Sequence, residues 1–384
     1  MARIAAKAEL LRWALERSNH TEEEASEKWP RFVDWITQVN NPTVRQLEEF
    51  SKWTYTPFGY LLLETPPEDS LPIPDFRTAQ GKPRRPSPDL LDTIQAMQRR
   101  QDWLRDFMIE EIEDPLPFVG AYALDSSANA IANSMRDSLN LEPMWASHER
   151  NWGDAVRLLR NRIEDAGVMV VINGVVGNNN RRQLDVDEFR GFVLVDTYAP
   201  LVFINGRDAQ CAQMFTLAHE FAHLFIGREG VSNLRQLQPT DIDVEIICNK
   251  AAAEFLVPEK VFHEIWSQVQ NQSNRFQLLA SKFKVSAIVA ARRALDLNRI
   301  GRSQFVEFYE KEIRESSERV EKQRKQNSGG DFWRTQGVRI GALFGTAVAQ
   351  ATSTGRLLYR DAYKLTGLHG QTFDNFVARL GLQG

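Results

Sequence analysis

Cysteine is scarce in this chain, and long apolar runs are missing from it. The 384 residues include two cysteines, Cys211 and Cys248, and both lie in apolar stretches with helical periodicity. A disulfide framework is therefore not expected, which indicates a reducing compartment. No stretch approaches the roughly 20 apolar residues of a membrane-spanning helix, and the first residues lack the apolar core of a signal peptide. We therefore expect a cytoplasmic protein that does not bind membranes.

The chain also has little net charge. Its formal charge of −4 gives no general attraction to nucleic acid or to an anionic membrane. Hydrophobic residues make up 42% of the chain and charged residues 26%, which is ordinary for a protein with a buried core. A length of 384 residues is enough for two or three domains.

Changes in composition divide the sequence into four parts. Residues 1–63 have the pattern of short helices joined by tight turns. Residues 64–88 contain seven prolines, which exclude a regular helix and predict a linker. Residues 89–326 mix strand and helix patterns, and residues 331–384 predict a small, mostly helical unit. The predicted fold class is α+β, with an all-α unit before the mixed part and a small, mostly α unit after it.

The mixed part contains three apolar runs that predict strands, at 168–173, 192–196 and 201–205. The second and third are close enough to form an antiparallel hairpin, and the polar residues 174–182 predict a loop after the first. We therefore expect a small antiparallel sheet. At the edge of this sheet, residues 201–205 are expected to hold an extended peptide substrate by backbone pairing.

The strongest chemical signal is the run HEFAH, an H-E-x-x-H motif inside a predicted helix. His219 and His223 lie one helical turn apart on the same face, so both imidazoles can reach one ion. Zinc accepts neutral imidazole and prefers four ligands in a tetrahedron. Glu220 is offset by one residue, which places it beside a water in the open position, where a general base is needed.

A third protein ligand has to come from outside this motif. An H-E-x-x-H-x-x-G-x-x-H pattern would need Gly at 226 and His at 229, but these positions are Ile226 and Glu229. Glu245 on the next predicted helix is the better candidate. Asn249, one turn further along the same face, is placed to hydrogen-bond a ligating histidine and fix its orientation. Two nearby acids remain rivals for the third position: Asp243 and Glu254.

These residues suggest a hydrolytic reaction on a peptide bond. Zinc would polarise the scissile carbonyl, and Glu220 would carry a proton from water to the leaving amine. His263 and Tyr198 are candidate donors to the developing oxyanion. A His/His/Glu site also accepts Mn²⁺ or Co²⁺, so the sequence does not select among the three metals.

Three stretches resemble the ImmA/IrrE family of metallo-endopeptidases: FVLVDTYAPLVFIN, MFTLAHEFAHLFIG and EIICNKAAAEFLVP. The family's H-E-x-x-H motif matches His219, Glu220 and His223. Its later E-x-x-A-N-x-F-A-A-E-x-L-x-P pattern matches Glu245, Asn249, Ala252, Ala253, Glu254, Leu256 and Pro258. Cys248 replaces the family's small Ala, and Lys250-Ala251 replaces its x-Phe. Neither change is expected to touch a ligand.

The resemblance extends over residues 190–300 and implies a zincin-like, gluzincin-type core. Residues 10–63 loosely resemble the Xre-type helix-turn-helix domain that is fused to many members of the family. The resemblance implies a role in the stress response or in the regulation of mobile elements or toxin–antitoxin pairs. It further implies that a transcriptional repressor or an antitoxin is the substrate or partner.

DNA binding by residues 1–63 is disfavoured by their charge. They contain eight Lys or Arg and nine Asp or Glu, whereas DNA affinity comes chiefly from neutralising phosphates. The stretch 30–35 has one Arg and lacks the Arg, Asn and Gln set that contacts base edges. A role in binding a protein or in dimerisation is therefore favoured.

Two functions are compatible with these patterns. The first is a zinc-dependent endopeptidase that cleaves a specific partner protein. The second is a non-proteolytic transcriptional regulator or toxin-like binding protein whose metal is structural or sensory. The sequence is compatible with a homodimer in either case.

Overall fold

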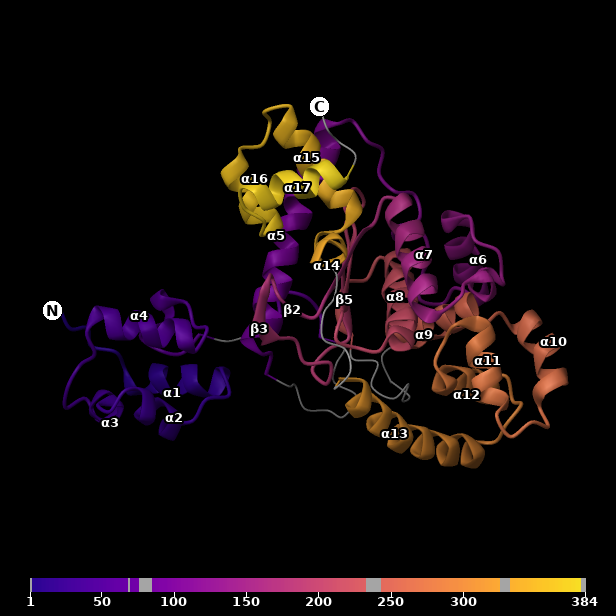
Figure 1. The fold of residues 1–384 in the computed structure, drawn as a ribbon, viewed down its shortest axis with the longest axis horizontal. Coiled ribbons are helices and arrows are strands. Elements are labelled where there is room, and N and C mark those ends of the chain that lie inside the picture. The colour runs from indigo at the N-terminus through magenta and orange to yellow at the C-terminus, as the bar shows by residue number, and fades with distance from the viewer. Residues whose placement is uncertain (1, 68–69, 76–84, 233–242, 325–331, 381–384) are drawn as a thin grey trace. The chain divides into compact units, whose positions relative to one another are not determined.

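The computed structural model describes residues 2–67, 70–75, 85–232, 243–324 and 332–380. The chain divides into two compact units. The first holds Met1–Pro72 and Pro83–Gln95, and the second holds Ile73–Lys82 and Ala96–Gly384. Figure 1 shows the helices and strands of both units in chain order. The long helix α5 (Pro88–Glu110) contributes residues to each of them.

The first unit consists of short helices around an aromatic core, which agrees with the all-α character predicted for residues 1–63. Thr21 and Thr43 each form a capping box, with Glu24 and Gln46, that starts α2 and α4. The core contains aromatic rings in mutual contact: Trp29, Phe32, Trp35 and Phe50. The helices are α1 (Ala8–Arg17), α2 (Glu22–Lys28), α3 (Phe32–Ile36), α4 (Val44–Trp53) and the 3₁₀ turn η1 (Phe58–Leu62).

The second unit contains a four-stranded sheet within the described residues, in the order β1-β5-β4-β6. Its strands are β1 (Met169–Asn173), β4 (Gly191–Leu194), β5 (Leu201–Asn205) and β6 (Gly230–Ser232). The predicted β4–β5 hairpin is confirmed, and β6 pairs antiparallel with the other side of β4. The prediction of an antiparallel sheet is wrong for β1, which runs parallel to β5. Since β1 is parallel to β5 and β4 is antiparallel to β5, β1 runs opposite to β4.

The residues between β1 and β4 also differ from the prediction. The expected polar loop at 174–182 is a small antiparallel hairpin of β2 (Val175–Val176) and β3 (Asn179–Gln183). The side chains of β3 are largely exposed, so this hairpin has no apolar alternation that would mark it as a strand pair.

The expectation that residues 201–205 form a sheet edge is wrong. β5 is flanked by β1 and β4, and all its residues are buried, as an apolar strand covered on both faces should be. The edge strands are β1 and β6. Part of the outer side of β6 is already occupied, because the amide of Val231 donates to the carbonyl of Pro74 at 3.0 Å and Asp75 forms a parallel bridge with Val231.

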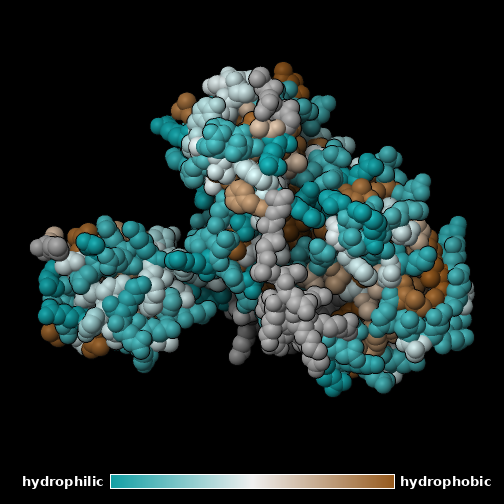
Figure 2. All heavy atoms as spheres, viewed as in Figure 1, coloured by the Kyte–Doolittle hydropathy of each residue, from teal (hydrophilic) through white to brown (hydrophobic). Residues whose placement is uncertain are grey.

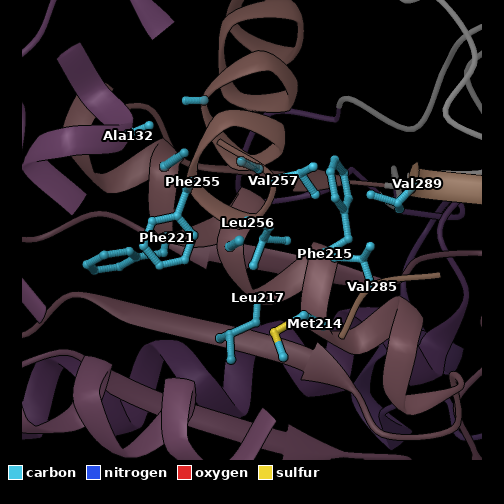
Figure 3. Packing of buried hydrophobic residues seen from close by; sticks show 14 of the residues in the cluster. Ala132, Met214, Phe215, Leu217, Phe221, Phe255, Leu256, Val257, Val285 and Val289 are labelled. Atoms are coloured by element: carbon cyan, nitrogen blue, oxygen red, sulfur yellow. The ribbon is translucent and has the colours of Figure 1, made fainter. Parts of the chain in front are cut away.

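Helices surround this sheet, and α8 is central among them. It packs on β4, β5, α7 and α9, and α9 also packs on α6. Figure 3 shows Leu217 and Phe221 of α8 beside Phe255 and Leu256 of α9. The helices are α6 (Ala128–Leu139), α7 (Trp152–Asp165), α8 (Gln210–Ile226), α9 (Asp243–Leu256), α10 (Glu259–Val269), α11 (Arg275–Phe283), α12 (Ala287–Asp296) and α13 (Arg302–Arg324), with the 3₁₀ turn η2 (Trp145–His148).

The surface of both units is mostly hydrophilic on the face seen in Figure 2, with hydrophobic residues scattered over it. In the described ranges, no helix combines the length and the apolar character that crossing a membrane requires.

Residues 332–380 form four helices: α14 (Phe332–Ile340), α15 (Ala342–Ser353), α16 (Tyr359–Thr366) and α17 (Gln371–Arg379). Helices α14 and α15 pack against β1, and α15 also contacts α7. The turn between α14 and α15 is made by Gly341 at φ 87°, a conformation that side chains rarely adopt.

A buried carboxyl group of α7 holds the start of α15. Glu164 accepts a hydrogen bond from the amide of Ala342 at 2.6 Å, and Arg160 lies 3.5 Å from its other oxygen. Burial raises the pKa of Glu164 to about 7, although Arg160 and the amides at the start of α15 oppose the shift.

This pKa predicts a pH-dependent stability that Glu164→Gln removes. The folded chain holds the proton more tightly than the unfolded chain, so the contribution is complete below about pH 4.5 and is lost as the pH rises through about 7. As the pH rises from about 4.5 to above 7, we expect the free energy of unfolding of the wild type to fall by up to roughly 3 kcal/mol more than that of Glu164→Gln. Urea unfolding at pH 4.5, 6 and 8 measures this. Glu142→Gln, at an exposed position, serves as the control, and parallel profiles for wild type and Glu164→Gln would contradict the prediction.

Candidate metal centre

Helix α8 supplies three buried polar side chains to the interior of the second unit. His219, Glu220 and His223 are each 0% exposed, although most of their neighbours on α8 are apolar. The helix ends at Gly227, whose left-handed conformation at φ 68° terminates it one residue after Ile226. The histidines lie one turn apart on the same face, as their spacing predicts.

Helix α9 brings Glu245 to these two rings. The Nε2 atoms of His219 and His223 are 3.0 Å apart. The carboxylate of Glu245 lies 3.3 Å from Nε2 of His219 and 3.1 Å from Nε2 of His223. In the part of the chain that the structure describes, these are the three His, Cys, Asp or Glu residues whose ligand atoms gather within 4.8 Å of one another. We call them the His-His-Glu cluster.

The other acids considered as the third ligand are not part of this cluster. Glu254 forms a buried ion pair with Arg293, and its carboxylate also accepts from the amide of Glu259. Asp243 is exposed at the first turn of α9. Glu229 is half-buried, and it is absent from the described cluster. The geometry therefore selects Glu245 from the acids that the sequence left open.

Both rings present Nε2 to the cluster. His223 is oriented by its Nδ1 atom, which donates to the carbonyl of Arg228 at 3.1 Å. Asn249 lies beside His219 and raises the pKa of that ring. Nδ1 of His219 and Oδ1 of Asn249 are both buried without another hydrogen-bond partner. Each is therefore the natural partner of the other.

The charges of the cluster are strongly coupled. Burial lowers the pKa of His219, although Glu245 opposes this. Burial also lowers the pKa of His223, but Cys248 and Glu245 outweigh it and raise that pKa well above its usual range. Burial alone would raise the pKa of Glu245, yet the two imidazoles hold it well below its usual range. The cluster therefore favours positive charge between the ring nitrogens and the carboxylate.

Glu220 is buried beside the cluster. Burial raises its pKa to about 8, although the charge of His223 and the hydroxyl of Ser232 oppose the shift. Gly191 of β4 leaves it this space, because a Cβ atom there would lie 2.9 Å from Oε1 of Glu220. Sequence reasoning did not identify Gly191, whose need for glycine appears only when β4 and α8 are packed together.

Two further residues near the rings were also missed. The thiol of Cys248 is buried and acts on the pKa of His223, so the replacement at this position does touch a proposed ligand. The hydroxyl of Ser232 on β6 lies 3.5 Å from Nε2 of His219. Cys248 follows Glu245 by three residues on the same helix, so its place near the rings could have been recognised from the sequence. Ser232 could not, because the residues of β6 have no recognisable strand pattern.

The candidate oxyanion donors have other surroundings. His263 lies 3.4 Å from Glu259 and contacts the guanidinium of Arg299. The backbone of Tyr198 is held in a turn by the carboxylate of Asp196. In the described part of the chain, no hydrogen bond or ion pair joins either residue to the His-His-Glu cluster. The structure brings together the ligands, Glu220 and Asn249, but not these two.

The cluster fits a divalent cation. It offers two imidazole nitrogens and one carboxylate, a set that zinc commonly takes with a fourth position left open. The carboxylates of Glu220 and Glu245 are buried polar groups beside the rings, and a cation and its water would satisfy them. Mn²⁺ and Co²⁺ fit the same donors.

Comparison with known families gives two matches. Residues 163–295 match the Peptidase M78 family, described as the IrrE N-terminal-like domain. Peptidases of this family are metal-dependent, and the match spans both helices of the buried cluster. Residues 340–379 match a domain of unknown function (DUF8813). No curated protein matches the chain. The ImmA/IrrE resemblance is thereby supported for the part of the chain that holds the cluster.

The cluster predicts one bound metal per chain. We expect His223→Ala and Glu245→Ala to lose it on dialysis, because each removes one of three ligands and leaves two. Elemental analysis after dialysis measures the metal content, and thermal unfolding with and without chelator measures the linked stability. His148→Ala removes an exposed histidine and should keep one equivalent. Equal metal content in all four proteins would contradict the site.

Asn249 predicts a smaller effect. Asn249→Ala keeps all three ligands but frees the His219 ring, so the metal affinity should fall by about tenfold to a hundredfold. Competition with a chromophoric chelator measures this. Lys250→Ala, at the exposed neighbouring position on α9, should bind as the wild type does. An Asn249→Ala affinity equal to that of Lys250→Ala would show that Asn249 does not orient the ring.

Proposed function

We propose that this chain is a zinc-dependent endopeptidase of the ImmA/IrrE type with a zincin-like, gluzincin-type core. The observation that carries the proposal is the convergence of His219, His223 and Glu245 from two helices, with Glu220 buried beside them. The match of residues 163–295 to the Peptidase M78 family supports it independently of that geometry.

The His-His-Glu cluster and Glu220 have different roles in the proposed hydrolysis. A cation held by the cluster supplies Lewis acidity, which polarises a carbonyl and lowers the pKa of water. Glu220 receives a proton from the attacking water and passes it to the leaving amine. Burial raises the pKa of Glu220, so its carboxylate can accept a proton from water and its carboxylic acid can still donate that proton to the amine. His223 and His219 keep their rings in place through Arg228 and Asn249.

Cavities near both ends of the helix pair support a substrate of peptide size. A cavity of about 540 Å³ is lined by Phe215, one turn before His219, and by Asn249. A second cavity of about 690 Å³ is lined by Arg228, whose carbonyl orients His223, and by Val244. Side chains on either side of a scissile bond would each have room, so the two cavities are compatible with an extended protein segment.

The substrate in this proposal is a specific protein, a transcriptional repressor or an antitoxin, as the family resemblance implies. The resemblance also supports a role in the stress response, in mobile-element control or in toxin–antitoxin regulation. The proposed N-terminal unit is an Xre-like helix-turn-helix that binds a protein rather than DNA, because its eight basic and nine acidic residues leave no positive excess.

Glu220→Gln separates catalysis from metal binding. The variant keeps every ligand and the shape of the side chain, so it should retain one equivalent of metal. It loses the base, so cleavage should fall by about a hundredfold to ten thousandfold. The assay is mass spectrometry of fragments after the zinc-loaded chain is incubated with the product of the neighbouring gene and with a peptide library.

Glu264→Gln, at an exposed position on α10, is the matched control and should cleave as the wild type does. If Glu220→Gln cleaves as fast as the control, Glu220 is not the base and the proposal fails. If it loses cleavage but keeps the full biological effect, the metal site is structural or sensory and the chain is a non-proteolytic regulator.

A further inference from the structure

A further cavity of this unit, different from the two beside the metal centre, is rich in arginine. It measures about 680 Å³ and is bounded by α7, the end of β1, the turn before α8, and α14. The charged residues among its described lining are five arginines and one acid: Arg157, Arg160, Arg207, Arg334, Arg339 and Asp208. We call it the arginine cavity.

The acids near this cavity are already engaged. Asp208 pairs with Arg190, outside the lining, at 2.6 Å. Arg157 pairs with Asp154 at 2.7 Å, and Arg160 lies 3.5 Å from Glu164. None of these carboxylates is left for the remaining three arginines of the lining.

Those three arginines have no acidic partner in the described part of the chain. Arg207 donates to the amide oxygen of Gln183. Arg339 reaches the amide oxygens of Asn178 and Asn180, at 3.5 Å and 3.3 Å. Arg334 forms no hydrogen bond or ion pair with the described residues. Three positive charges therefore face the same space with neutral partners or with none.

Two arginines of the lining, Arg160 and Arg339, are partly buried, which disfavours their charged form. Burial lowers the pKa of Arg160, which Glu164 opposes, and the neighbouring charges of Arg157 and Arg334 add to the lowering. Nε of Arg160 is buried, and the carboxylate of Glu164 lies 3.5 Å from it, which is longer than an ordinary hydrogen bond. Burial also lowers the pKa of Arg339. A negative ligand would relieve the repulsion between these charges.

Two glycines let the backbone segments that line the cavity pack closely against each other. Gly174 and Gly206 let two turns approach closely, since a Cβ at Gly174 would lie 2.7 Å from Cγ of Arg207. The first turn of α8 contributes Gln210 and Gln213 to the lining, and the start of a helix carries partial positive charge. A guanidinium presents a planar fork that matches two phosphate oxygens.

We propose that the arginine cavity binds a small molecule with two or more linked phosphates, such as a nucleoside triphosphate. Its volume lies within the range of small-molecule sites. Arg157, Arg160 and Arg207 come from the sheet-and-helix body, whereas Arg334 and Arg339 come from α14. A ligand held by both sets joins the C-terminal helices to the body that carries the metal centre.

Calorimetric titration of the full chain with ATP, tripolyphosphate and adenosine tests the site. We expect ATP and tripolyphosphate to bind and adenosine not to bind, because the phosphates carry the recognition. Arg334→Gln and Arg339→Gln should each weaken binding by about tenfold to a hundredfold, the loss expected for charged hydrogen bonds. Arg302→Gln, an exposed arginine outside the lining, should bind as the wild type does. Glu245→Ala should also bind ATP normally, which excludes chelation at the metal centre.

Three outcomes overturn the proposal. The first is unchanged ATP affinity in the double variant Arg334→Gln/Arg339→Gln. The second is the absence of heat with ATP and with tripolyphosphate at millimolar concentration. The third is binding of an oligonucleotide without binding of ATP, which would make the cavity part of a nucleic-acid surface. Thermal unfolding of each variant confirms that it folds, and Arg339→Lys should recover part of the affinity because it restores the charge.

Discussion

The close packing of α8 against α9 places two imidazoles and a carboxylate together in the interior of the second unit. His219, His223 and Glu245 are almost fully buried, and each carries polar atoms whose desolvation is costly unless a partner satisfies them. Ala251 and Ala252 of α9 are buried and small, which lets the two helices approach closely. A single cation between the helices would satisfy all three groups at once. Phe221 of α8 and Phe255 of α9 belong to one cluster of buried apolar residues, which holds the helices in that position (Figure 3).

Other features of the unit follow from the same constraint. Gly191 is needed because Glu220 lies against β4, and Gly227 is needed because α8 must end where the carbonyl of Arg228 can accept from His223. The sheet supports α8 from one side, and α6 covers α9 from the other. Buried titratable groups with strongly shifted pKa values are typical of functional sites. The sheet and helices therefore stabilise an arrangement that would be unfavourable without a ligand.

Much of this centre could be predicted from sequence because its signals are local. The spacing of His219 and His223 within one helix fixes their common face, and Asn249 follows Glu245 by one turn. The direction of β1 could not be predicted, because β2, β3 and β4 lie between β1 and β5 in the chain and no tight turn fixes their pairing. The contact of Cys248 with His223 and the space at Gly191 depend on the packing of separate elements. The arginine cavity was missed for the same reason, since its arginines come from α7, α14 and the turn before α8.

The two sites use opposite ends of one helix. Gln210 and Gln213, in the first turn of α8, line the arginine cavity, and His223 lies in its last turn. The aligned peptide dipoles of a helix favour negative charge at its start and positive charge at its end, by about 0.3–1 kcal/mol each. An anion in the arginine cavity and a cation in the His-His-Glu cluster would be the charges that these two ends favour. The two sites share no residue, so loss of the metal is expected to leave the arginine cavity able to bind its anion.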